Sequence, residues 1–120
     1  MSNVLDGALK ALAPGISEEC IWHFFLLAFV SDLFRGNIPK DKLTQFLTYF
    51  ICVVPHCLIH VPIILTQNFV FGIINILFIS LLFGTPMVWL IKNKNLETAI
   101  GFHWAVDFIR FIFVVWNNTL

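Results

Sequence analysis

The sequence predicts an all-α protein, a polytopic membrane helix bundle with about four transmembrane helices. Hydrophobic residues make up 59% of the 120 residues, and charged residues only 12%, which is about half the usual share of a soluble domain. A chain this short leaves much of its surface exposed, so its apolar surface has to face lipid. Four stretches of the chain are also apolar over the roughly 20 residues that a membrane-spanning helix needs.

The first expected element is an N-terminal interfacial or capping segment, residues 1–15, which has a weak helical period. Residues 16–116 are expected to form the transmembrane core. The spans expected in that core cover residues 16–34, 43–65, 69–91 and 97–116.

The sequence around each span supports these limits. The first span follows Pro14-Gly15 and ends at the break 35–39, and the third has no charged residue. The second span contains Pro55 and Pro62. Interior prolines are tolerated in a membrane, because neighbouring helices can satisfy the carbonyls that proline leaves free.

The basic residues predict how the chain is oriented. Five of them lie in the loops 35–42 and 92–96, whereas only Lys10 lies near a terminus. The positive-inside rule then places both loops in the cytoplasm and both termini on the other side of the membrane. We therefore expect an integral membrane protein, of the inner or plasma membrane if the source is bacterial. The net charge of zero gives no indication of a nucleic-acid partner.

Ionisable residues inside the predicted spans indicate a functional site. Such a residue costs at least ~2.5–3.5 kcal/mol near the bilayer centre, so it normally faces the interior of the bundle. These residues, which include all four histidines of the chain, are Glu18, Glu19, His23, His56, His60, His103, Asp107 and Arg110.

Their spacing places them in pairs on helix faces. Glu19 and His23 are four residues apart, and the same spacing separates His56 from His60 and His103 from Asp107, so each pair shares one face of its helix. Each residue alone also has a purely structural interpretation. The two glutamates could be first-turn anions, Asp107 and Arg110 could neutralise each other, and a single histidine could only join two helices. Their presence on three of four predicted helices favours a common site.

The order of these motifs along the chain resembles one protein family. The motifs are Glu18-Glu19-x-x-x-His23, then His56-x-x-x-His60, then His103-x-x-x-Asp107. They resemble EExxxR, FxxxH and HxxxN or HxxxD of the CPBP family, the CAAX-protease and bacteriocin-processing (abortive-infection) intramembrane endopeptidases. The segments "APGISEEC" and "ETAIGFHWAVDFI" resemble the first and last family motifs, and the resemblance covers residues 13–110.

The resemblance implies a peptidase and assigns roles to its residues. Glu18 would be the general base, His60 and His103 would surround the water, and Asp107 would stand at the last motif position. Glu19 would be a supporting partner of this group.

The chain departs from the family pattern at two positions. His23 stands in place of arginine, and His56 in place of the common phenylalanine. Family members also usually carry helices before the core. One hypothesis is that Arg110 supplies the missing cation from the last helix.

The alternative to a metal-free peptidase is a metal-dependent one that uses the same residues. His60, His103 and Glu18 could hold Zn²⁺ with one position left for water. We favour the metal-free mechanism and expect no cofactor.

The expected substrate is a peptide or a lipidated peptide, met in contact with membrane lipid. Two rival functions remain. One is an inactive relative that binds a peptide or confers bacteriocin immunity, and the other is a proton- or ion-conducting bundle. A homodimer or a partner membrane subunit could complete the cavity wall.

Overall fold

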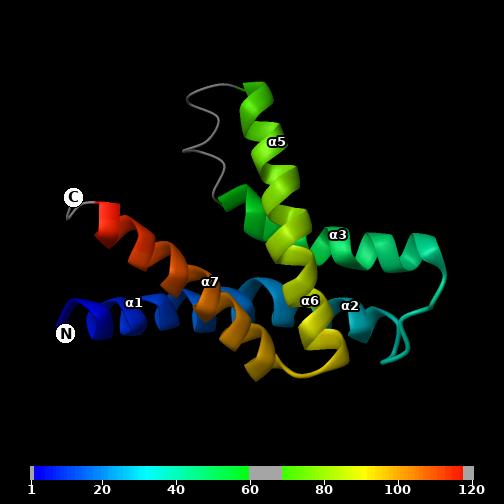
Figure 1. The fold of residues 1–120 in the computed structure, drawn as a ribbon. Helices are drawn as coiled ribbons and strands as arrows, with labels where there is room; N and C mark the ends of the chain where they lie inside the picture. The colour runs from blue at the N-terminus through cyan, green and yellow to red at the C-terminus, as the bar shows by residue number, and fades with distance from the viewer. Residues whose placement is uncertain (1, 60–68, 118–120) are drawn as a thin grey trace.

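Helices form all of the secondary structure in the described parts of the chain, residues 2–59 and 69–117 of a computed structural model (Figure 1). The elements in chain order are α1 (Ser2–Glu18), η1 (Glu19–Phe24), α2 (Phe25–Leu33), α3 (Lys42–Ile59), α5 (Phe69–Ile79), η2 (Ser80–Gly84), α6 (Thr85–Asn93) and α7 (Leu96–Asn117). Within these ranges they make four long helices, because α1 to α2 and α5 to α6 each run on without a break. The predicted all-α class is confirmed.

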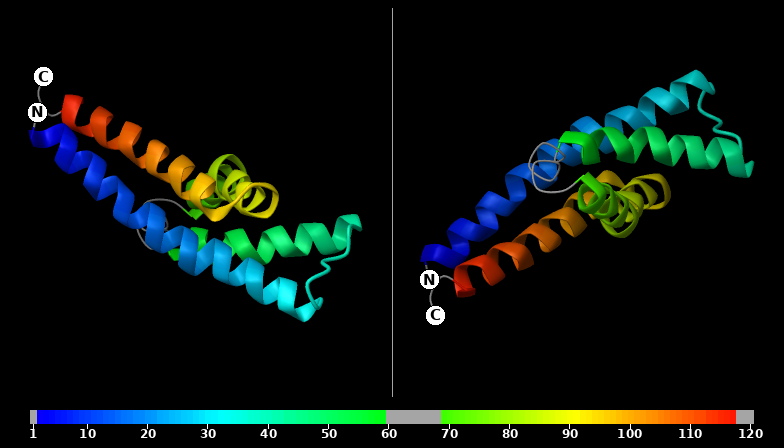
Figure 2. Two further views of the ribbon diagram at one scale, coloured as in Figure 1. Left: turned by 90° about the horizontal axis from the view of Figure 1, so that it is seen from below. Right: turned by 90° about the horizontal axis from the view of Figure 1, so that it is seen from above.

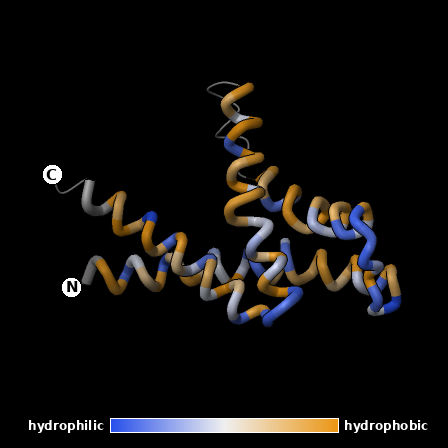
Figure 3. The backbone as a smooth tube through the Cα atoms, turned by 45° about the vertical axis from the view of Figure 1, so that its right-hand side comes forward, coloured by the Kyte–Doolittle hydropathy of each residue, from blue (hydrophilic) through white to orange (hydrophobic). Residues whose placement is uncertain are grey.

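Two of these helices are long and apolar enough to cross a membrane, Lys42–Ile59 and Phe69–Asn93. In Figure 3, α5 is hydrophobic along most of its length, whereas the loop between α2 and α3 is hydrophilic. The first and last helices instead carry most of the ionisable residues discussed above. The complete bundle of four spans therefore stays a prediction. The expected second span extended to residue 65, and its part beyond Ile59, with Pro62, lies outside the described residues.

The first helix begins at Ser2, so the predicted helix start at residue 16 is wrong. The chain passes through Pro14 without leaving the helix, and the Ser17 hydroxyl donates a hydrogen bond to the Ala13 carbonyl at 2.9 Å. Proline removes one backbone hydrogen bond. Ending the helix there would leave several backbone groups without partners, which costs more in an apolar environment. The prediction of a weakly helical stretch at residues 2–13 is correct, but it belongs to the same helix.

Small residues let α1 and α7 pack closely. The two helices lie side by side and antiparallel, with the two termini at the same end of the molecule (Figure 2). Gly7, Ala11 and Gly15 are buried at four-residue intervals on α1. A Cβ atom on Gly7 would lie 2.4 Å from the Phe111 ring. Four-residue spacing of small residues is a known way for membrane helices to approach each other.

Two wide π-helical turns interrupt the regular helices, and the sequence patterns did not predict them. In η1 the backbone N–H of Phe25 donates to the Cys20 carbonyl, and after η2 the N–H of Thr85 donates to the Ser80 carbonyl. The second turn ends two residues before Pro86, whose ring would clash with a carbonyl of the preceding turn in a regular helix. The first turn carries Glu19 and His23 into the interior. Such turns often occur at functional sites.

The packed centre of the molecule lies where α3 meets α6 and α2. Its buried apolar side chains are Leu27, Cys52, Val53, Cys57 and Val88. In Figure 1, α5 and α6 cross α3 at a steep angle, and they do so close to this cluster.

Gly84→Ala tests this crossing. A Cβ atom on Gly84 would lie 2.5 Å from Cγ1 of the buried Val53, so the helices would have to separate. We expect a loss of about 1–3 kcal/mol in the free energy of unfolding, measured by denaturation in detergent. Adding Val53→Ala to the Gly84→Ala protein should restore part of the lost free energy of unfolding. Gly101→Ala is the control, because a Cβ there meets nothing within 4 Å. Equal effects at the two glycines would contradict the prediction.

Asp41 caps the start of α3, the helix that carries His56. The backbone N–H of Thr44 donates to Asp41 Oδ1 at 2.9 Å and holds the pKa of this exposed carboxyl below its usual value. A lowered pKa means that the cap contributes fully above about pH 4, the unfolded value, and is lost as the pH falls through the folded value. At pH 7, Asp41→Ala should speed amide hydrogen exchange in the first turn of α3. Asp41→Asn, which keeps an acceptor oxygen, should not.

Candidate active site

Three helices bring six of the predicted site residues together. Glu18 ends α1, Glu19 and His23 lie in η1, His56 lies on α3, and His103 and Asp107 lie on α7. His60 lies outside the described residues, so its predicted role stays a prediction.

Five of these side chains form a closed polar ring, which consists of Glu18, Glu19, His23, His56 and His103. Its first three contacts join α1, η1 and α3. His23 Nδ1 lies 2.9 Å from Glu19 Oε2. His56 Nδ1 then lies 3.0 Å from His23 Nε2, and His56 Nε2 lies 2.7 Å from Glu18 Oε2. The remaining contacts come from α7, where His103 Nδ1 lies 2.8 Å from Glu19 Oε1 and His103 Nε2 lies 3.7 Å from Glu18 Oε2.

Burial separates the two glutamates. The side chains of Glu19 and His23 are fully buried, and each carboxylate oxygen of Glu19 contacts one histidine nitrogen. The Glu18 side chain is 22% exposed, and that of Asp107 is 25% exposed. Glu18 and Asp107 therefore lie at the open edge of the ring. A solvent molecule or a peptide can approach Glu18, whereas Glu19 can act only through its neighbours.

The hydrogen bonds of the ring determine how many protons it holds. Three consecutive bonds join Glu19, His23, His56 and Glu18, and each bond needs one proton between its two atoms. Two neutral imidazoles supply only two protons. A third proton therefore has to sit on a histidine or on a carboxyl group when all three bonds are made.

His103 connects the buried glutamate to the open edge. Its Nδ1 contacts Glu19, and its Nε2 lies 3.4 Å from Asp107 Oδ2 as well as 3.7 Å from Glu18. Both Nε2 distances are longer than an ordinary N–H···O hydrogen bond. An N–H group at Nε2 can therefore donate to an oxygen atom of a bound molecule without breaking a short hydrogen bond.

The close contact of α1 with α7 positions His103. The indole N–H of Trp104 donates to the Ala8 carbonyl at 2.8 Å, and a Cβ on Gly15 would lie 3.8 Å from His103 Cβ. The sequence analysis assigned no role in positioning His103 to Ala8, Gly15 or Trp104. The four-residue repeat of Gly7, Ala11 and Gly15 was the signal that could have identified this face of α1.

Arg110 lies outside the ring. Its side chain is exposed, and among the described residues no carboxylate lies within ion-pair distance of it. The suggested neutralising pair with Asp107 is therefore not formed. Arg110 and Asp107 instead line a cavity of about 260 Å³ between α1 and α7, together with Lys10. This cavity reaches the open edge of the site at Asp107.

The side chains of the ring do not form a metal site by themselves. Among the residues that the structure describes, no group of three or more His, Cys, Asp or Glu side chains is arranged to hold one. Each imidazole nitrogen of His23 and His56 contacts another side chain of the polar ring. These nitrogens therefore do not point at one common position where a metal ion could lie. Because His60 is outside this part of the chain, the zinc alternative stays a prediction.

Comparisons with known proteins identify one family. Residues 1–109 match a family model described as type II CAAX prenyl endopeptidase Rce1-like. Neither the curated proteins nor the solved structures compared with the chain give a match. The matched range contains all three motifs that the sequence analysis singled out.

Proposed function

The chain belongs to the Rce1-like family of type II CAAX prenyl endopeptidases, and on this premise we propose that it is an intramembrane endopeptidase in which Glu18 activates water. The predicted family is thereby confirmed. The observation that supports the role of Glu18 is its position: it is the partly exposed carboxylate of the ring, with His56 at 2.7 Å and His103 at 3.7 Å.

The proposed reaction uses Glu18, His103 and His60. Glu18 takes a proton from water as the water oxygen attacks the peptide carbonyl. The carbonyl oxygen becomes negative, and the Nε2–H of His103 donates to it. Because the Nδ1–H of the same ring donates to Glu19, His103 acts in this step as an imidazolium with a proton on each nitrogen. Glu18 then gives its proton to the leaving amine, which restores the carboxylate. His60, at the position of the family's histidine, is proposed to hold the same water.

The remaining side chains of the site are proposed to support this reaction. Glu19 orients His103 through the 2.8 Å contact, and Asp107 lies at the other nitrogen of that ring. Where the family has arginine, the His23–His56 pair can hold the third proton of the ring and so supply the positive charge locally. Arg110 is not needed for this purpose, so the departure at His23 is compatible with activity.

The family is one of integral membrane proteases, and we propose that all four helices span the membrane. Glu19, His23 and His103 on the first and last helices are buried in the ring, which supports a position of these helices among lipid. The loops 35–42 and 92–96 are proposed to lie in the cytoplasm. The proposed substrate is a peptide or a lipidated peptide, and a second copy or a partner subunit could complete the wall of the site.

Cleavage by the reconstituted protein tests the proposal. Farnesylated and unmodified peptides with a CAAX end would be added to proteoliposomes, and products followed by mass spectrometry. We expect the wild type to cleave the farnesylated peptide. His103→Ala should reduce the rate by about 10²–10³, as the loss of an oxyanion donor does in other enzymes. A chelator should leave the rate unchanged. Binding of the peptide without cleavage would favour the inactive relative, for which the substitution at His23 is the supporting observation.

A further inference from the structure

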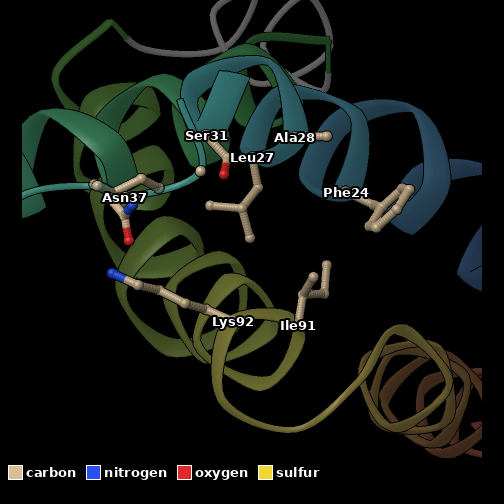
Figure 4. A pocket seen from close by; sticks show the side chains of 9 residues that line it. Phe24, Leu27, Ala28, Ser31, Asn37, Ile91 and Lys92 are labelled. Carbon is tan, nitrogen blue, oxygen red and sulfur yellow. The ribbon is translucent and has the colours of Figure 1, made fainter. Parts of the chain in front are cut away.

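A groove outside the polar ring is lined by both apolar and polar side chains. It lies between α2, α6 and the loop that joins α2 to α3, and it encloses about 450 Å³ (Figure 4). At about 30 Å³ for each water-sized group, this volume holds about fifteen such groups, which corresponds to a single hydrocarbon chain. None of the five ring residues lines it.

The walls of the groove change from apolar to polar along its length. Phe24, Leu27 and Ile91 supply apolar surface, and in Figure 4 the Leu27 side chain points into the groove. Asn37 and Lys92 form the opposite end, with the Lys92 amine near Asn37. A molecule with an apolar tail and a polar head matches this order.

The polar end of the groove carries a net positive charge. The Lys92 amine donates to Gln45 and lies 5.7 Å from the centre of the Tyr49 ring. Within the described ranges, no acidic side chain pairs with any of the bases on this side of the molecule. These bases are Arg35, Lys40, Lys42, Lys92 and Lys94. Three acids, Asp32, Asp41 and Glu97, lie in or next to the same loops, so the five bases leave an excess of two positive charges at this end.

We propose that this groove binds one anionic phospholipid, with an acyl chain against Leu27 and Ile91 and the phosphate at Lys92 and Asn37. Charge complementarity selects the lipid, because bases outnumber acids at this end and Lys92 lines the groove itself. This site goes beyond the proposed peptidase function. It rests on the membrane location alone, and its test does not depend on cleavage.

Lipid retention tests the proposal. The protein would be reconstituted in nanodiscs of equimolar phosphatidylglycerol and phosphatidylcholine, extracted in mild detergent and analysed by native mass spectrometry. We expect one retained phosphatidylglycerol for each chain. Lys92→Gln should lower its retention about five-fold, the effect of one base near an anionic lipid surface. Ala28→Trp, which fills the groove, should abolish it.

Matched variants make the result decisive. Lys94→Gln removes a neighbouring charge that does not line the groove, and Phe29→Trp adds bulk on the same helix outside it. Both should retain the lipid. Circular dichroism and thermal unfolding would confirm that Lys92→Gln and Ala28→Trp are folded. Equal retention of the two phospholipids, an equal loss in Lys94→Gln, or displacement of the lipid by farnesylated peptide would each overturn the proposal.

Discussion

Glu18→Gln is expected to lower the rate of peptide cleavage by about 10²–10⁴, which is the usual contribution of a general base. The amide keeps the size of the side chain and can still accept a hydrogen bond from His56 Nε2, which lies 2.7 Å from Glu18 in the native ring. It cannot take a proton from water. The defect should therefore appear in kcat, whereas binding of the peptide and the thermal unfolding temperature should change little.

A second carboxylate serves as the control for this experiment. Glu97 lies in the exposed first turn of α7, away from the ring, so Glu97→Gln should leave the cleavage rate unchanged. A Glu18→Gln protein that is folded and still cleaves at the wild-type rate would remove Glu18 from the mechanism. Unchanged cleavage in Glu18→Gln together with a loss in His103→Ala would instead direct attention to Asp107, the other carboxylate at the open edge.

Glu19→Ala is expected to have the largest effect on stability. Glu19 is fully buried and accepts from both His23 and His103, so its removal leaves two buried imidazoles without their partner. Breaking a buried pair in this way costs about 3–5 kcal/mol. Denaturation in detergent micelles, followed by circular dichroism, measures the loss.

Glu18→Ala is the matched comparison, because Glu18 belongs to the same ring but lies at its open edge. Solvent can replace part of what this carboxylate provides, and the loss of stability should be clearly smaller than for Glu19→Ala. If Glu18→Ala destabilised the protein as much as Glu19→Ala, the distinction between a structural and a reactive glutamate would fail. Retention of wild-type stability by Glu19→Ala would contradict the role of the ring in holding the helices together.

The sequence predicted the contacts between site residues on the same helix but not the contacts between different helices. The four-residue spacing of Glu19 and His23, and of His103 and Asp107, is a property of one helix, and both pairs are in contact in the structure. The contact of His56 with His23 joins residues 33 positions apart. It depends on how α3 packs against η1, which no local pattern encodes.

The main errors of prediction have the same physical origin. Pro14-Gly15 is a sound local signal for a helix boundary, yet the contact with α7 keeps the chain helical there. The turns η1 and η2 depend on which side chains must reach the interior and on how neighbouring helices pack. Arg110 has the right spacing from Asp107, but at the exposed surface of α7 it forms no pair with it.

The pairing of the first helix with the last one affects the order of events during synthesis. Glu19 contacts His103, which follows it by 84 residues, and Ala8 contacts Trp104 after 96 residues. While the chain emerges from the ribosome, the glutamates of the first helix lack their α7 partners until nearly the whole chain has been made. Because unpaired carboxylates are costly in the bilayer, this helix should enter the membrane fully only once α7 is available. Nascent chains arrested before Leu96 should therefore leave the first helix accessible to water-soluble labels, and chains extended beyond Asp107 should protect it.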